Sequence, residues 1–135
     1  MKLLVLPELR FRRLWFCLGL GIAVAIAVVC LMPGRNIPQF RLVSDKVEHA
    51  LAFAMLAFWF GSILVRRDLL WLALALVAFG GLIEVAQGLM GLGRHADLLD
   101  LVADTVGVVV GLLLALTPLG RWAGFIERMF LRPAP

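Results

Sequence analysis

Charged residues are scarce in this chain. Asp, Glu, Lys and Arg make up 16% of its 135 residues and 63% are hydrophobic, whereas soluble domains average roughly 25% charged and 45–50% apolar residues. No polar stretch is long enough to hold a second domain. The composition therefore predicts one membrane-embedded domain over residues 1–135.

Cysteine and the common catalytic motifs are nearly missing too. The two cysteines, Cys17 and Cys30, fall in one apolar run, where a helix would hold them about 20 Å apart, too far for a disulfide. The sequence has no Gly-rich phosphate loop, no G-x-S-x-G and no catalytic cysteine setting. We expect no cofactor.

The net charge of +4 raises the question of a nucleic-acid partner. The basic residues lie in short segments between apolar runs, which is the pattern of membrane topology. No basic stripe with interleaved aromatics is present. We therefore predict no nucleic acid, and membrane lipids with anionic headgroups as partners.

Four apolar runs, at about 14–32, 47–65, 69–92 and 98–116, are each long enough to cross a ~30 Å hydrocarbon core. Backbone groups in lipid must be satisfied internally, so these runs predict helices. The first run also resembles a signal peptide, but its length and the sequence after it favour an uncleaved anchor. We predict an all-α, integral membrane four-helix transmembrane bundle.

Lys and Arg set the expected orientation. Nine of them flank the side that carries both termini and four flank the other side, so the positive-inside rule places both termini in the cytoplasm. After the last run, apolar residues at 122, 125, 126, 129 and 130 form a helical stripe. We predict a short interfacial amphipathic helix at about 121–131, with a partner-binding helix as the alternative.

Two acidic residues interrupt the apolar runs. Glu84 lies about 12 Å of helix before Leu92, and Asp104 lies about 10 Å after Asp97. Their depths should therefore match on adjacent antiparallel helices. An ionisable group at membrane depth is costly, so it is expected to face protein or a wet cavity and to have a role.

Glycine spacing indicates which way these acids point. Each acid shares a helical stripe with residues at i, i+4, i+7 and i+11, namely Gly80, Glu84, Gln87 and Gly91 in one run and Asp100, Asp104, Gly107 and Gly111 in the next. Small residues let helices approach closely. We predict Gly80, Gly91, Gly107 and Gly111 as packing positions, and acids that face protein.

Several polar residues also have plainer interpretations. The pairs Asp45 with Glu48 and Asp97 with Asp100 are typical of helix N-caps. Lys46 and Arg94 either meet lipid headgroups or supply counter-charges to the acids. A packing histidine at His49 and a helix-bridging amide at Gln87 also fit the pattern.

Three segments resemble the VanZ-like membrane protein family over about residues 40 to 115. Residues 45–49 resemble its D-K-x-x-H, residues 84–87 its E-x-x-Q, and residues 94–111 its R-x(5)-D-x(3)-N-x(2)-G-x(3)-G. Asp104 stands where the family usually has Asn. This acid is then either protonated or paired with Lys46, His49 or Arg94.

The resemblance implies the bacterial envelope, since one member is linked to resistance to the glycopeptide teicoplanin. It implies no reaction, so whether the protein is an enzyme stays open. We predict a multi-pass protein of the bacterial inner membrane with a polar pocket near the outer leaflet that recognises or processes an anionic envelope component, such as a lipid-linked or cell-wall precursor headgroup. The alternative is a structural or partner-binding module; homo-oligomerisation stays open.

The candidate site residues fall into two groups. Those expected to be catalytic are His49, Glu84 and Asp104, and those expected to bind the ligand are Lys46, Gln87, Arg94 and Asp100. A divalent-metal site built from His49, Glu84 and Asp100 or Asp104 is a weaker hypothesis, because no H-E-x-x-H is present. We predict no metal.

Overall fold

The computed structural model describes residues 5–32, 44–90 and 96–130, and this part of the chain is all-helical. Besides helices it holds one isolated backbone bridge, between Val5 and Leu64. In chain order the elements are α1 (Arg12–Leu31), α2 (Asp45–Ile63), the 3-10 turn η2 (Arg66–Asp68), α3 (Leu69–Met90), α4 (Leu98–Leu116), the 3-10 turn η3 (Pro118–Arg121) and α5 (Trp122–Phe130). The predicted all-α class is confirmed.

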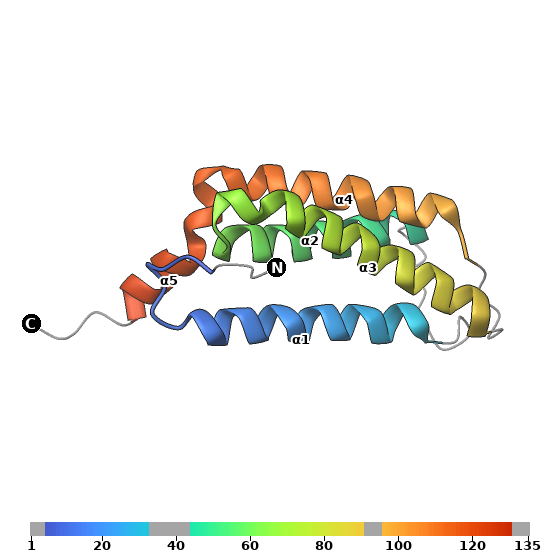
Figure 1. Cartoon of the computed structure of the whole chain (residues 1–135), viewed down its shortest axis with the longest axis horizontal. Helices are drawn as coiled ribbons and strands as arrows, with labels where there is room; N and C mark the ends of the chain where they lie inside the picture. The colour runs from blue at the N-terminus through green and yellow to red at the C-terminus, as the bar shows by residue number, and fades with distance from the viewer. Residues whose placement is uncertain (1–4, 33–43, 91–95, 131–135) are drawn as a thin grey trace, which may run out of the picture.

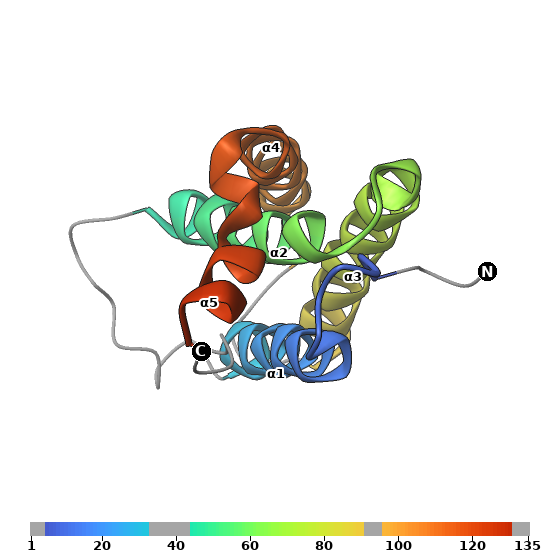
Figure 2. The same ribbon diagram turned by 90° about the vertical axis from the view of Figure 1, so that its left-hand side faces the viewer.

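The helix bounds follow the predicted apolar runs closely. α4 covers the predicted 98–116, α3 begins at the predicted Leu69, and α1 and α2 each begin two residues early. Figure 1 shows α1 to α4 lying lengthwise beside one another, with α5 at one end. Seen along their length in Figure 2, α4 and α1 lie on opposite sides of α2, and α3 lies beside α2 and α4.

The closest helix pair is α2 with α4. Gly107 and Gly111 of α4 lie directly against the backbone of α2, where a Cβ would overlap the carbonyl oxygens of Ala50 and Ala54. Small residues on both helices therefore permit backbone-to-backbone packing. Gly80 of α3 likewise leaves room for the carboxylate of Asp104.

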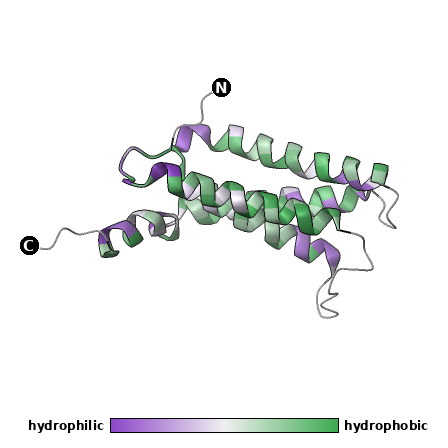
Figure 3. Ribbon diagram, turned by 90° about the horizontal axis from the view of Figure 1, so that it is seen from below, coloured by the Kyte–Doolittle hydropathy of each residue, from purple (hydrophilic) through white to green (hydrophobic). Residues whose placement is uncertain are grey.

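The buried core is centred on α2. Phe53, Leu56, Ala57 and Ile63 are fully buried, and α2 contacts α1, α3 and α4. The other helices present large apolar side chains outward, and Leu82 of α3 and Leu98 of α4 are 68% and 75% exposed. Continuous apolar surface of this kind is rare on soluble monomers. Figure 3 shows the hydrophobic colour along the helices and hydrophilic residues gathered toward their ends.

In the described residues, three helices are long and apolar enough to cross a membrane: Arg12–Leu31, Arg66–Met90 and Leu98–Leu116. The fourth predicted span, α2, is not among them. Its first two turns carry Asp45, Lys46, Glu48 and His49, which lower its mean hydropathy. A fourth crossing therefore stays a prediction, although α2 has the length of the others.

α5 is fastened to the start of α1 through Glu127. This carboxylate is 8% exposed and accepts hydrogen bonds from the backbone N–H groups of Arg10 (2.7 Å) and Phe11 (2.9 Å) and from Trp15 Nε1 (2.8 Å). The ring of Trp15 also packs edge-on against Trp122 at 5.1 Å. Burial alone would raise the pKa of Glu127, but the donated hydrogen bonds outweigh it and hold that pKa below its ordinary value.

Candidate functional site

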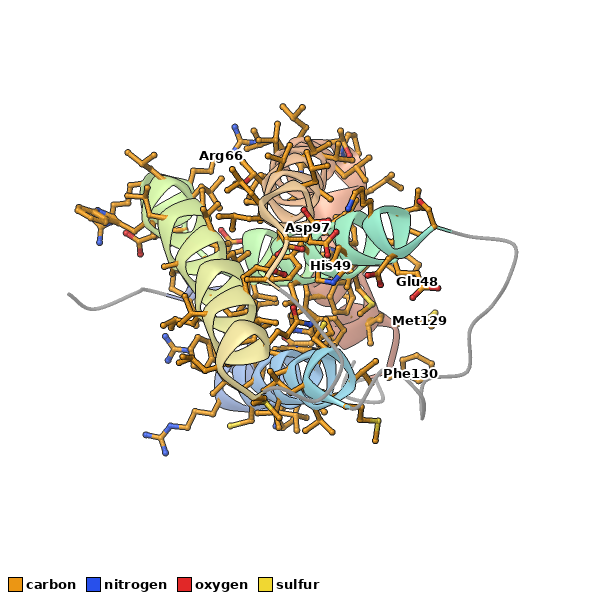
Figure 4. All side chains as sticks on the ribbon, turned by 90° about the vertical axis from the view of Figure 1, so that its right-hand side faces the viewer. Glu48, His49, Arg66, Asp97, Met129 and Phe130 are labelled. Carbon is orange, nitrogen blue, oxygen red and sulfur yellow. The ribbon has the colours of Figure 1, made fainter. Side chains whose placement is uncertain are left out.

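Polar side chains from three helices meet at one end of the bundle. They come from the first turns of α2, the last turns of α3 and the first turns of α4, which lie side by side because consecutive helices run antiparallel. We call this group the polar cluster; its members are Lys46, His49, Glu84, Gln87, Asp97, Asp100 and Asp104. Figure 4 looks onto this end of the bundle, with His49 and Asp97 near its middle and Glu48 further out.

The centre of the polar cluster is a buried histidine–aspartate pair. His49 Nδ1 lies 3.0 Å from Asp104 Oδ1, and the two residues are 4% and 0% exposed. The second oxygen of Asp104 lies over Gly80 and is buried without a hydrogen-bond partner among the described residues. Of the partners considered for Asp104, the structure therefore gives His49 and not Lys46.

Lys46 bridges two aspartates of α4. Its Nζ donates to Asp97 Oδ2 at 2.6 Å and to Asp100 Oδ1 at 3.0 Å. Lys46 and Asp97 are partly exposed, whereas Asp100 is buried. The hydrogen bond from Lys46 lowers the pKa of Asp97. The ammonium charge is thus already matched by carboxylates.

Glu84 and Gln87 tie α3 to other segments. Glu84 Oε2 accepts the backbone N–H of Asp97 at 2.8 Å, while its Oε1 is buried and has no hydrogen-bond partner in the part of the chain that the structure describes. Gln87 Nε2 donates to the carbonyl oxygen of Cys30 at the end of α1, also at 2.8 Å. Gln87 therefore bridges α3 to α1. Neither of these two partners can be identified from the sequence. Both are backbone groups, which are present whatever the side chain is.

The two predicted N-caps have different outcomes. Asp97 is the N-cap of α4, and its Oδ1 accepts the backbone N–H of Leu99 at 2.8 Å, which confirms that interpretation. For Asp45 it is wrong. The N-cap of α2 is Ser44, with no side-chain cap hydrogen bond, so Asp45 is the first helical residue. A carboxylate oxygen of Asp45 lies within 4.8 Å of a ring nitrogen of His49.

A cavity of about 380 Å³ opens beside the polar cluster, between α1 and α2. Asp45, Glu48 and His49 form its polar part, while Ile22, Ile26 and Val29 of α1 form part of its apolar wall. Asp104 holds the imidazole through Nδ1, so Nε2 is the ring nitrogen left for a ligand. Of the three predicted catalytic residues, only His49 lines this cavity; Glu84 and Asp104 lie behind it.

Three potential metal ligands also converge here. One ligand atom each of Asp45, His49 and Asp100 lies within 4.8 Å of the others. This set differs from the metal set considered from the sequence, because it includes Asp45 and omits Glu84 and Asp104. A carboxylate behind a histidine ligand, as Asp104 lies behind His49, is a common outer partner of metal ligands. Lys46 already contributes positive charge at Asp100.

Arg94 and Gly91 lie outside the described residues, so their predicted roles as ligand-binding and packing positions stay predictions. The remaining candidate residues lie in the polar cluster or at its helix contacts. Lys46 and Asp100 are joined directly, as are His49 and Asp104, whereas Gln87 is directed to α1.

Fold and site together define the class: a helical, multi-pass membrane protein with a buried histidine–carboxylate cluster under one end of the bundle. Comparison with known proteins gives no match to a family model, to a curated protein or to a solved structure. The VanZ-like resemblance therefore remains a prediction from the residues themselves.

Proposed function

We propose that the protein is a VanZ-like component of the bacterial inner membrane, with four crossings and both termini in the cytoplasm. The segments that carry the resemblance are far apart in sequence, yet their polar residues interact. Lys46 of the first segment bonds Asp100 of the third, His49 bonds Asp104, and Glu84 of the second segment accepts the N–H of Asp97. A shared motif is expected to converge in this way when it forms one site.

α2 is proposed as the fourth crossing and α5 as the interfacial helix. α2 is as long as α4 and is enclosed by α1, α3 and α4, so it needs less apolar surface than a lipid-facing helix. α5 leaves Phe125, Met129 and Phe130 between 56% and 71% exposed. Exposed apolar residues beside arginines are typical of helices that lie at a membrane surface.

The proposed activity is recognition or processing of an envelope component at the polar cluster. The observation that carries it is the His49–Asp104 pair, buried at the edge of a cavity. An ionised Asp104 would keep the proton on Nδ1 and leave Nε2 able to accept a proton or a hydrogen bond from a ligand. A purely structural role does not require an imidazole that is held in one orientation at the edge of a cavity.

Binding of an anionic headgroup, and an effect on glycopeptide susceptibility, belong to the same proposal. An anion needs a cation that is not already paired. Lys46 is shared between Asp97 and Asp100, so the anion-binding role falls to Arg94. The apolar wall that α1 contributes would suit the lipid part of a lipid-linked precursor.

The second candidate function is a structural or partner-binding module. It is favoured by the number of cross-helix hydrogen bonds in the polar cluster, which link α1 to α3, α2 to α4 and α3 to the start of α4. Buried hydrogen bonds between helices help to specify how the helices pack. On this view the carboxylates only hold the bundle together.

The substitution Glu84→Gln separates the two functions. A glutamine Oε1 still accepts the N–H of Asp97 while the charge is lost, so we expect thermal stability in detergent close to that of the wild type. We expect the variant, and Arg94→Ala, to lose any change in teicoplanin susceptibility conferred on a responsive host. Arg13→Gln, an exposed charge away from the polar cluster and outside the cavity linings, is the control.

Two results would decide against the proposed activity. If both variants, at normal protein levels, give the host the same teicoplanin susceptibility as the wild-type protein does, the polar cluster has no role in that phenotype. A large loss of stability in Glu84→Gln, in proportion to the loss of phenotype, would favour the structural module instead.

A further inference from the structure

A second cavity lies at the opposite end of the bundle, where α5 meets the start of α1. Its volume is about 720 Å³. The chain before α1, the ends of α2 and α4, both 3-10 turns and α5 all contribute to its lining. Four of its lining residues are arginines, and we call it the arginine cavity: Arg10, Arg66, Arg121 and Arg128.

The positive charge of the arginine cavity is not balanced by its own carboxylates. Glu8 and Glu127 are the acids in its lining. The carboxylate of Glu127 is occupied by two backbone N–H groups and the Trp15 indole, none of them a guanidinium. In the described parts of the chain no carboxylate forms an ion pair with any of the four arginines.

Neighbouring arginines make the contrast clear. Arg67 adjoins Arg66 in the same turn, yet it lies outside the lining and its Nε is 3.9 Å from Asp68. Arg12 and Arg13 at the start of α1 are exposed, as the four cavity arginines are, but they are not part of the lining. Four of the described arginines at this end therefore share one cavity, whereas Arg12, Arg13 and Arg67 lie outside it.

The lining is amphipathic. Beside the arginines it contains leucines from several segments, namely Leu6, Leu9, Leu64, Leu69 and Leu116. The surface next to it continues with exposed apolar residues: Leu119 is 63% and Phe125 59% exposed. A free inorganic anion would gain nothing from such walls, whereas a lipid with a charged headgroup and acyl chains matches both halves of the lining.

We propose that the arginine cavity binds the phosphate headgroup of an anionic phospholipid, with the acyl chains directed along the leucines and η3. Guanidinium groups suit phosphate because they donate two parallel hydrogen bonds. Basic pockets at the ends of membrane helices are also the places where headgroups are found. The proposal concerns a different end of the molecule from the polar cluster and is independent of the function proposed there.

The test compares two double variants of the full-length protein in detergent. Arg66→Gln/Arg121→Gln removes two cavity arginines, and Arg13→Gln/Arg67→Gln removes the same charge from the same end outside the cavity. Retention of phosphatidylglycerol and of phosphatidylcholine is measured by native mass spectrometry. A surface arginine contributes about fivefold to anionic-lipid binding, so we expect about 25-fold weaker phosphatidylglycerol binding in the cavity variant only.

Three further comparisons test the proposal: a lysine variant, a second lipid and competition by inorganic phosphate. Arg66→Lys/Arg121→Lys keeps the charge but not the paired donors and should lose less affinity than the glutamine variant. In the wild type, phosphatidylglycerol should be retained over phosphatidylcholine, and millimolar inorganic phosphate should not displace it. Equal losses in both glutamine variants, equal retention of the two lipids by the wild type, or ready displacement by phosphate would each overturn the proposal.

Discussion

The contact between α2 and α4 leads to a sharp prediction about Gly107. A Cβ at this position would overlap the carbonyl oxygen of Ala50 and lie 3.0 Å from the backbone nitrogen of Ala54. These neighbours are backbone atoms of α2, which cannot rotate away as a side chain could. The substitution Gly107→Ala therefore forces the two helices apart along their whole contact.

The magnitude follows from two opposing effects. Overpacking a well-packed core costs about 1–3 kcal/mol, and rigid backbone neighbours place this case at the upper end. Replacing glycine by alanine inside a helix returns about 1 kcal/mol through helix propensity. We expect a net loss of about 2 kcal/mol in the free energy of unfolding.

The assay is equilibrium unfolding of the purified protein in detergent by titration with SDS, followed by far-UV circular dichroism. Gly81→Ala is the matched control, because it changes the same residue type in α3 where a Cβ would meet nothing within 4 Å. It should be neutral or slightly stabilising. Equal stability of Gly107→Ala and Gly81→Ala would show that α2 and α4 do not pack through this glycine.

The remaining predictions concern Glu127, which joins α5 to α1. Glu127→Ala would leave the partly buried donors of Arg10, Phe11 and Trp15 without this acceptor, and we expect a loss of about 1–2 kcal/mol in the same titration. Because the pKa of Glu127 is lowered on folding from 4.5, its stabilising contribution is complete above pH 4.5 and is lost as the pH falls through the folded-state value. The wild type should therefore lose more stability than Glu127→Gln when titrated down from pH 6; parallel curves would contradict this.

The sequence predicts the helices well because apolar run length is the dominant signal in lipid. The bounds of α4 agree with the predicted run. The equal depth expected for Glu84 and Asp104 is only approximate, because Glu84 reaches Asp97 at the start of α4 while Asp104 lies over Gly80, one turn further into α3. The sequence cannot tell whether α2 crosses the membrane, because its polar first turns and its apolar remainder give opposite signals. Its central place in the bundle emerges only from tertiary packing.

Partner choice within the site is also beyond the sequence. The spacing of Gly107 and Gly111 predicts a packing face but not that α2 lies against it. Lys46 and His49 are equally reasonable partners for Asp104 until the helices are placed, and the structure pairs Asp104 with His49. Capping shows the same limit, since the sequence predicts Asp45 as the cap of α2 and only the backbone conformation shows that Ser44 takes this place.

The central claim is that His49 and Asp104 form one buried unit at the meeting point of α2 and α4. A double-mutant cycle with His49→Gln and Asp104→Asn, read out as the free energy of unfolding in SDS, tests it most directly. We expect the two substitutions to be non-additive by about 1–3 kcal/mol, as for residues in contact within one network. Additive effects, within about 0.5 kcal/mol, would mean that the two side chains do not meet and would contradict the account.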